Sequence, residues 1–243
     1  MTAAVVFRGS APRARSGRWS RLRILVALAV AVAVVAAAAW VVLETSVLGV
    51  RSVEVAGTER LTRAEVVAAA DVRPDAPLAR VDLTAVSGRI RALPAVASVE
   101  VERSWPDGLR IVVHERVAAA LQNHGSSWRL VDASGVAFAD VRTRPRGLPV
   151  VTAAGAAGDS YDETFRAALD VLADVQGNIR RQLVEVRAAS PDQIVLRLTH
   201  SRTVVWGSPE RGRRKATVLA ALMTRKASVY DVSAPDVPTT RRG

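Results

Sequence analysis

The 243-residue chain contains no cysteine, three histidines and only 4% aromatic residues. Without cysteine it can have no disulfide, thiolate nucleophile or cysteine metal ligand, so packing alone must stabilise its folded part. The histidines His114, His124 and His200 are far apart in sequence, and no two have the i, i+4 spacing of a helical metal site. We therefore expect neither a metal site nor a cofactor.

Acidic residues are absent from the first 43 positions, which hold six arginines. The whole chain has a formal charge of +11, from 34 basic and 23 acidic residues. Much of the excess thus lies at the N-terminus, and the modest remainder is typical of a solvated surface. The basic cluster Arg211–Lys215 comes without an aromatic stacking pattern. A helix start or a contact with an anionic surface explains it better than nucleic-acid binding, which we do not expect.

Residues 24–43 form a run of twenty positions without charge or proline. As a helix this run would span about 30 Å, the thickness of the hydrocarbon core. We expect residues 1–23 to be a basic cytoplasmic tail, 24–43 a single transmembrane helix, and the rest to lie outside the cytoplasm. The arginines that determine this type II topology in the cell membrane, by the positive-inside rule, are Arg13, Arg15, Arg18, Arg21 and Arg23. A cleaved signal peptide is the alternative, but its apolar region runs over only about 7–15 residues.

The segment after the apolar run has the pattern of a small α+β domain. The alternation in "VRSVEVAG" predicts a strand that ends at Gly57. Thr62 and Glu65 have the spacing of a capping box and predict a first helix. Asp82 is a good N-cap for a second helix, which Pro94 ends. "VASVEVERSW" and "LRIVVHERV" alternate around the turn "PDG" and predict a hairpin. The order β-α-α-β-β predicts a three-stranded sheet with both helices on one face.

The runs "VRSVEVAG", "PLARVD" and "LPAVASVEVERSWPDGLRIVVHER" resemble the membrane-proximal POTRA domain of the cell-division family FtsQ/DivIB. The resemblance implies a POTRA domain at residues 48–116. Within it, Trp105 and Pro106 are expected to shape the hairpin, and Glu115 and Arg116 to pair at the domain edge. These are structural roles and not those of a site.

Residues 117–235 are expected to form a second mixed domain with a β meander and helices. "SWRLVDASGVAFAD" predicts two strands around a turn. Ser160 and Glu163 suggest a capping box for a helix that Gly177 stops. "LVEVRAASPDQIVLRLTHSRTVVWG" predicts three strands, Ser208 and Pro209 a helix start, and "SVYDVSAP" a last strand. The family resembles this part too, in "lvD-x-x-G-x-x-f" and "Y-x-D-v-x-x-P", which implies an FtsQ-type β domain. Residues 236–243 are expected to be a flexible tail.

No grouping of residues indicates catalysis. Asp170 and Asp174 stand one helical turn apart, and we expect both to lie on the solvated face of a helix. Ser134 and Ser190 lie in predicted turns, where serine is common for structural reasons. A nucleophile with a nearby base is not evident, so we expect that the protein is not an enzyme.

The resemblance implies a non-enzymatic scaffold of the bacterial division machinery, located at the septum. It implies that the protein links cytoplasmic and extracytoplasmic division proteins. Its expected direct partners are FtsB-like and FtsL-like bitopic proteins, and its indirect partners are septal wall synthases like FtsW and FtsI. A membrane-anchored POTRA protein of protein export or envelope assembly is the alternative, and the identity of the partners distinguishes the two.

The last predicted strand is the candidate partner-binding site, because an edge strand offers unpaired N–H and C=O groups to a partner strand. The prolines that follow it prevent an extension of the sheet. Tyr230 is either an interface anchor or a core residue, and proline at Val229 or Val232 is expected to block strand addition. The candidate residues are Ser228, Val229, Tyr230, Asp231, Val232 and Ser233.

Overall fold

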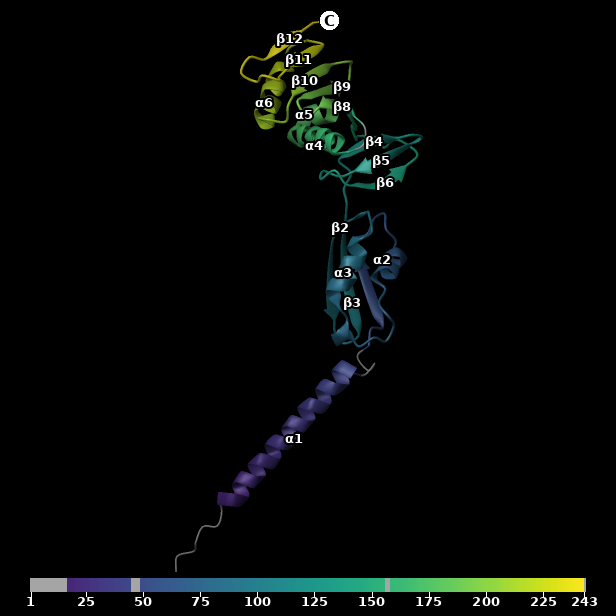
Figure 1. Cartoon of the computed structure of the whole chain (residues 1–243), viewed down its shortest axis with the longest axis vertical. Coiled ribbons are helices and arrows are strands. Elements are labelled where there is room, and N and C mark those ends of the chain that lie inside the picture. The colour runs from purple at the N-terminus through teal and green to yellow at the C-terminus, as the bar shows by residue number, and fades with distance from the viewer. Residues whose placement is uncertain (1–16, 45–48, 156–157, 243) are drawn as a thin grey trace, which may run out of the picture.

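The computed structural model describes residues 17–44, 49–155 and 158–242. Figure 1 shows a long helix, a small domain and a larger domain in that order along the chain, with the C-terminus at the end of the molecule opposite the helix. Of the predicted topology-determining arginines, Arg13 and Arg15 lie outside the described residues, and the other three lie in the long helix.

The long helix α1 spans Gly17–Glu44. Large apolar side chains along it are exposed, among them Ile24, Val35 and Trp40 at 66%, 67% and 63%. Over the part of the chain that is described, no helix combines the length and the apolarity needed to cross a membrane. The transmembrane span at residues 24–43 therefore stays a prediction.

The first domain has the predicted order of elements. Its sheet has the order β1-β3-β2, with β1 parallel and β2 antiparallel to β3. The capping box of Thr62 and Glu65 and the N-cap of Asp82 are confirmed. The elements are β1 (Ser52–Ala56), α2 (Arg63–Ala70), the short 3-10 helix η2 (Leu78–Arg80), α3 (Leu83–Arg91), β2 (Val96–Ser104) and β3 (Gly108–Glu115).

The core of this domain lies between the sheet and its two helices. Val66 of α2 and Ile90 of α3 are fully buried against Ile111 and Val113 of β3. Gly57 ends β1 with φ +79°, and a Cβ at this position would lie 2.1 Å from the backbone carbonyl oxygen of Val113. Only glycine allows the chain to turn so close to β3.

The second domain is built on a nine-stranded mixed sheet of order β12-β11-β10-β9-β8-β7-β4-β5-β6. Helix α4 packs on β7 and β8, and α6 lies beside α4. The elements are β4 (Ala120–His124), β5 (Ser127–Val131), β6 (Ala137–Val141), β7 (Val150–Ala153), α4 (Asp159–Asp174), α5 (Gly177–Gln182), β8 (Leu183–Ser190), β9 (Gln193–Leu198), β10 (Thr203–Gly207), α6 (Gly212–Leu222), β11 (Val229–Asp231) and β12 (Thr239–Arg241).

The main core of the second domain lies under α4. Alternate side chains of the predicted meander β8-β9-β10 point into it, and Val186, Leu196 and Trp206 are fully buried. Phe165 and Leu172 from one face of α4 cover these strands. The two domains together agree with the predicted α+β fold.

The helix ends in this domain differ from those predicted. Helix α4 begins at Asp159, one residue before the proposed cap Ser160, and has no side-chain cap. It ends at Asp174, and Gly177 instead begins the short α5, which was not predicted. Helix α6 begins at Gly212 after Arg211, which has φ 55°, and not at Ser208. Local capping signals were overridden here by the packing of α4 and α6 on the sheet.

Candidate functional site

The predicted edge strand at residues 228–233 is not at the edge. Strand β11 pairs in parallel with β10 on one side and antiparallel with β12 on the other. The prediction of a flexible tail at residues 236–243 is therefore wrong for β12. Pro235 and Pro238 do not end the sheet; they form a turn, closed by the Val237 N–H donating to the Ala234 carbonyl, that reverses the chain into one more strand.

The turn between β11 and β12 is attached to the start of α6. The carboxylate of Asp236 accepts a hydrogen bond from Arg211 at 2.7 Å and forms an ion pair with Arg214 at 2.5 Å. The hydrogen bond from Arg211, with the charge of Arg214, lowers the pKa of Asp236. At the other end of β12, the Arg241 carbonyl accepts the Ser228 N–H at 3.0 Å. The hairpin is thus held at both ends.

Tyr230 is a core residue. It is 1% exposed, and its hydroxyl donates to the Arg225 carbonyl at 2.9 Å. Val232 is 0% exposed, and its N–H donates to the Val205 carbonyl. Of the six predicted partner-binding residues, all of which are described, only Ser233 is exposed. Proline at Val232 would therefore break the fold itself and would not test partner binding.

Strand β12 has an open side. Among the described residues, no strand pairs with it opposite β11. The Arg241 carbonyl points to β11, and successive residues of a strand direct their backbone groups to opposite sides. The N–H and C=O of Thr240 therefore face outward. This edge was missed because three residues after two prolines give no periodic signal.

A basic hollow of about 650 Å³ lies after the end of α6, and its lining includes Arg242, the residue that follows β12. Its lining comes from the β9–β10 turn, the segment after α6, strand β11 and the residue after β12, and among the described residues no acid contributes to it. Three arginines, one lysine and one histidine line it: His200, Arg202, Arg225, Lys226 and Arg242. The guanidinium of Arg202 donates hydrogen bonds to the Thr199 carbonyl and to the side-chain oxygen of Gln182. Arg225, Lys226 and Arg242 are exposed.

The basic cluster Arg211–Lys215 is divided among different roles. Arg211 and Arg214 hold Asp236, as above. Lys215 is 2% exposed, and its ammonium group donates to the carbonyls of Trp206 at 3.0 Å and Ser208 at 2.8 Å. Burial, and then the charge of Arg211, lower the pKa of Lys215. It fixes the connection from β10 to α6, so the cluster begins a helix as expected.

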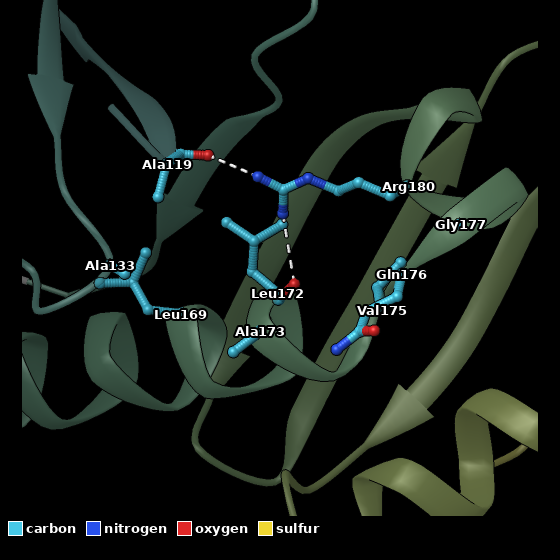
Figure 2. A pocket seen from close by; sticks show the side chains of 9 residues that line it. All are labelled: Ala119, Ala133, Leu169, Leu172, Ala173, Val175, Gln176, Gly177 and Arg180. Atoms are coloured by element: carbon cyan, nitrogen blue, oxygen red, sulfur yellow. Dashed lines mark hydrogen bonds between the residues drawn. The ribbon is translucent and has the colours of Figure 1, made fainter. Parts of the chain in front are cut away.

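A second cavity of about 390 Å³ lies between α4, α5 and the start of β4 (Figure 2). Its walls are mostly small or apolar side chains, and Arg180 lies at one side. The terminal nitrogens of Arg180 donate to the carbonyls of Ala119 at 2.8 Å and Leu172 at 3.2 Å. Burial lowers the pKa of Arg180. The arginine connects α4 to the first strand of the domain, which is a structural role.

The last two residues of the first domain, Glu115 and Arg116, were expected to pair with each other. Glu115 and Arg116 do not pair with each other, which corrects the prediction. The carboxylate of Glu115 accepts the backbone N–H groups of Glu59, Arg60 and Leu61 at 2.9–3.0 Å. Burial opposes its ionisation, but these hydrogen bonds and the Arg60 charge outweigh burial and lower its pKa.

Arg116 crosses from the first domain to the second. It donates to the Pro94 carbonyl at 3.1 Å and to the carboxylate of Asp132. Asp132 is 8% exposed and also accepts from Ser134 and from the Val136 N–H. Burial raises the pKa of Asp132, but the hydrogen bonds from Ser134, Arg116 and Val136 outweigh this and lower it. The two domains are thus joined by a partly buried ion pair and not only by the chain.

The two aspartates that stand one turn apart on α4 lie in different surroundings. Asp170 is exposed, whereas Asp174 is half-buried against α6, where a Cβ at Gly212 would lie 1.9 Å from its Oδ2. Within the described residues, no group of three or more histidine, aspartate or glutamate side chains could hold a metal ion.

Comparison with known proteins agrees with this architecture. Residues 48–116 match the family model for the POTRA domain, FtsQ-type, and residues 119–234 match that for the C-terminal part of the cell division protein FtsQ/DivIB. The chain is similar to cell division protein FtsQ of Streptomyces venezuelae, with 39% identity over 236 residues, which cover 94% of this chain and 87% of that protein.

Two further relatives carry the same name. Cell division protein FtsQ of Streptomyces griseus is 44% identical over 202 residues, covering 80% of this chain and 97% of that protein. That of Mycolicibacterium smegmatis is 37% identical over 197 residues, covering 81% of this chain and 58% of that protein. The chain belongs to the FtsQ/DivIB family of cell-division proteins.

Proposed function

We propose that this protein is a non-enzymatic scaffold of the division machinery that binds a partner by strand addition at the open side of β12. The observation that carries the proposal is the outward-facing backbone of Thr240, on a strand that is followed by Arg242 of the basic hollow. A partner strand would extend the nine-stranded sheet through main-chain hydrogen bonds, and side-chain contacts would select the partner.

The charge of the hollow indicates which partner strand fits. Exposed Arg225, Lys226 and Arg242 lie together without an acid among the described lining residues. An acidic segment next to the added strand would therefore be attracted to this end of the sheet. Val237, 74% exposed in the β11–β12 turn, offers an apolar contact at the opposite end of β12. The partners that we propose are FtsB-like and FtsL-like proteins, and through them septal synthases like FtsW and FtsI.

We propose further that α1 anchors the protein in the cell membrane, with its N-terminus in the cytoplasm. The support is the uncharged run 24–43 and the arginines before it. The apolar side chains of α1 are exposed in the isolated chain, as expected of a helix whose surroundings are lipid or other membrane helices. The partner-binding edge then lies at the end of the molecule farthest from the anchor (Figure 1).

Affinity purification tests the proposed function. The full-length protein is isolated from its native membrane through an N-terminal tag, and its partners are identified by mass spectrometry. Small bitopic coiled-coil proteins together with a septal synthase are the expected result. Recovery of export or envelope-assembly factors would favour the alternative, a membrane-anchored POTRA protein of another pathway.

A further inference from the structure

The end of the POTRA domain nearest α1 is attached to the chain directly after this helix. Val50 donates to the Ala76 carbonyl at 3.0 Å and accepts from Asp75 at 3.1 Å. It is 5% exposed and packs with Leu78 and Leu109 in a small core of its own. The chain is therefore bonded to the domain from Val50 onward.

The β2–β3 turn lies at this same end. The Asp107 carbonyl accepts the N–H groups of Arg51 at 2.8 Å and Ser52 at 3.3 Å, and Gly108 is paired with Ser52 across the sheet. Glu44, the last residue of α1, is five residues from Gly49. Five residues of chain span at most about 18 Å. If α1 spans the bilayer, the turn is held close to the membrane surface.

The turn presents a tryptophan to its surroundings. Trp105 is 54% exposed, although tryptophan is mostly well buried in soluble domains. An indole has an apolar ring and one polar N–H, and it is enriched at the level of the lipid headgroups. Arg51 and Arg73 are both exposed. Arg51 lies beside the turn, which contains Asp107, and Arg73 lies with Asp75 in the loop that binds Val50. The end is mixed in charge, so the aromatic ring is its distinguishing feature.

We propose that the β2–β3 turn is a second membrane contact, in which Trp105 inserts its indole into the headgroup region of the bilayer that α1 crosses. This inference rests on the proposed membrane anchoring. Two attachment points close to each other would restrict the tilt of the POTRA domain, and Arg116 would pass this restriction on to the β domain. The partner-binding edge would then be held away from the membrane.

The absence of cysteine makes the contact directly measurable. The full chain is reconstituted into vesicles of phosphatidylcholine and phosphatidylglycerol, and single cysteines carry an environment-sensitive fluorophore that nitroxide lipids quench. Ser104→Cys, at an exposed position beside Trp105, reports on the turn and keeps the indole, and Val34→Cys reports on α1. Ser98→Cys is the matched control, because it is exposed on β2 six residues before Ser104. At about 3.3 Å per residue it lies roughly 20 Å along the same strand.

Quenching by headgroup nitroxides is expected to be about threefold stronger at position 104 than at position 98, because it falls off over the few ångströms of the headgroup layer. Equal quenching at these positions, with the label at position 34 quenched by a deep nitroxide, overturns the inference and leaves the anchor intact. An unquenched label at position 34 overturns the anchor and with it this inference.

A second measurement tests the native indole. Quenching of a label at Arg51→Cys, next to the turn, is measured in the chain that keeps Trp105 and in the chain with Trp105→Ser. Insertion of the indole predicts about a twofold loss of headgroup quenching in the Trp105→Ser chain, since this aromatic side chain would no longer hold the turn at the interface. Unchanged quenching means that Trp105 does not hold the turn at the membrane and contradicts the inference.

Discussion

Thr240→Pro is expected to block partner binding while the fold stays intact. The N–H of Thr240 faces away from β11, because the neighbouring Arg241 carbonyl faces β11. Proline is tolerated on an edge strand where the lost N–H pointed to solvent, so the β11–β12 hairpin should keep its own hydrogen bonds. A partner strand would lose this donor, and the pyrrolidine ring would occupy the space of the next inter-strand bond.

The size of the effect follows from these two hydrogen bonds. Each is worth about 1 kcal/mol net, so the loss is about 2 kcal/mol and corresponds to roughly a 30-fold rise in Kd. The assay is interferometry of the full chain in lipid nanodiscs against the extracytoplasmic part of an FtsB-like protein of the same organism. Thr240→Val is the matched control, since it keeps the N–H and removes only the hydroxyl.

Thermal unfolding of the same samples separates binding from folding. If the Thr240→Pro variant melts like the wild type and still binds within about twofold of it, a change of roughly 0.4 kcal/mol, the added strand does not use the edge of β12. A loss of binding in the Thr240→Val variant as well would point to side-chain recognition and would also contradict strand addition.

Three further variants test the charge of the hollow, the ion pair between the domains and the turn at Gly57. Lys226→Glu combined with Arg242→Glu should weaken binding of an acidic partner about tenfold at low salt and less at high salt, because salt screens exposed charges; a salt-independent affinity would contradict this. Asp132→Ala should lower the free energy of unfolding by about 2–3 kcal/mol, since a guanidinium and two N–H groups lose their acceptor. Its pKa is lowered in the folded protein, so the stability that it adds is present above its unfolded pKa of about 3.9 and is lost as the pH falls through the folded value. Acid titration of unfolding in wild type and Asp132→Ala should therefore converge at low pH. Gly57→Ala should cost at least about 2 kcal/mol, since the new Cβ meets a backbone carbonyl, and calorimetry should show a smaller loss for Gly125→Ala, where φ is +64° but the space is open.

The local elements of the first domain could be predicted from sequence because their signals are local. The capping box at Thr62, the N-cap at Asp82 and the alternation in the hairpin depend on neighbouring residues only. The three-stranded meander of the second domain was predicted for the same reason. The family resemblance depends on these ordered runs as well, and the comparisons confirm it.

What the sequence by itself determined is thus the order of the elements in the first domain, the meander β8-β9-β10 and the family. Which backbone groups stay unpaired was decided only by the tertiary structure. Strand β11 was expected at the edge because two prolines follow it, yet the chain folds back as β12 and covers it. Tyr230 could have been core or interface, and burial against α6 and the sheet placed it in the core. The pairing of Arg116 with Asp132, and of Glu115 with the loop before α2, joins residues 16 or more positions apart. Such contacts depend on how the layers pack, and periodicity along the chain carries no information about them.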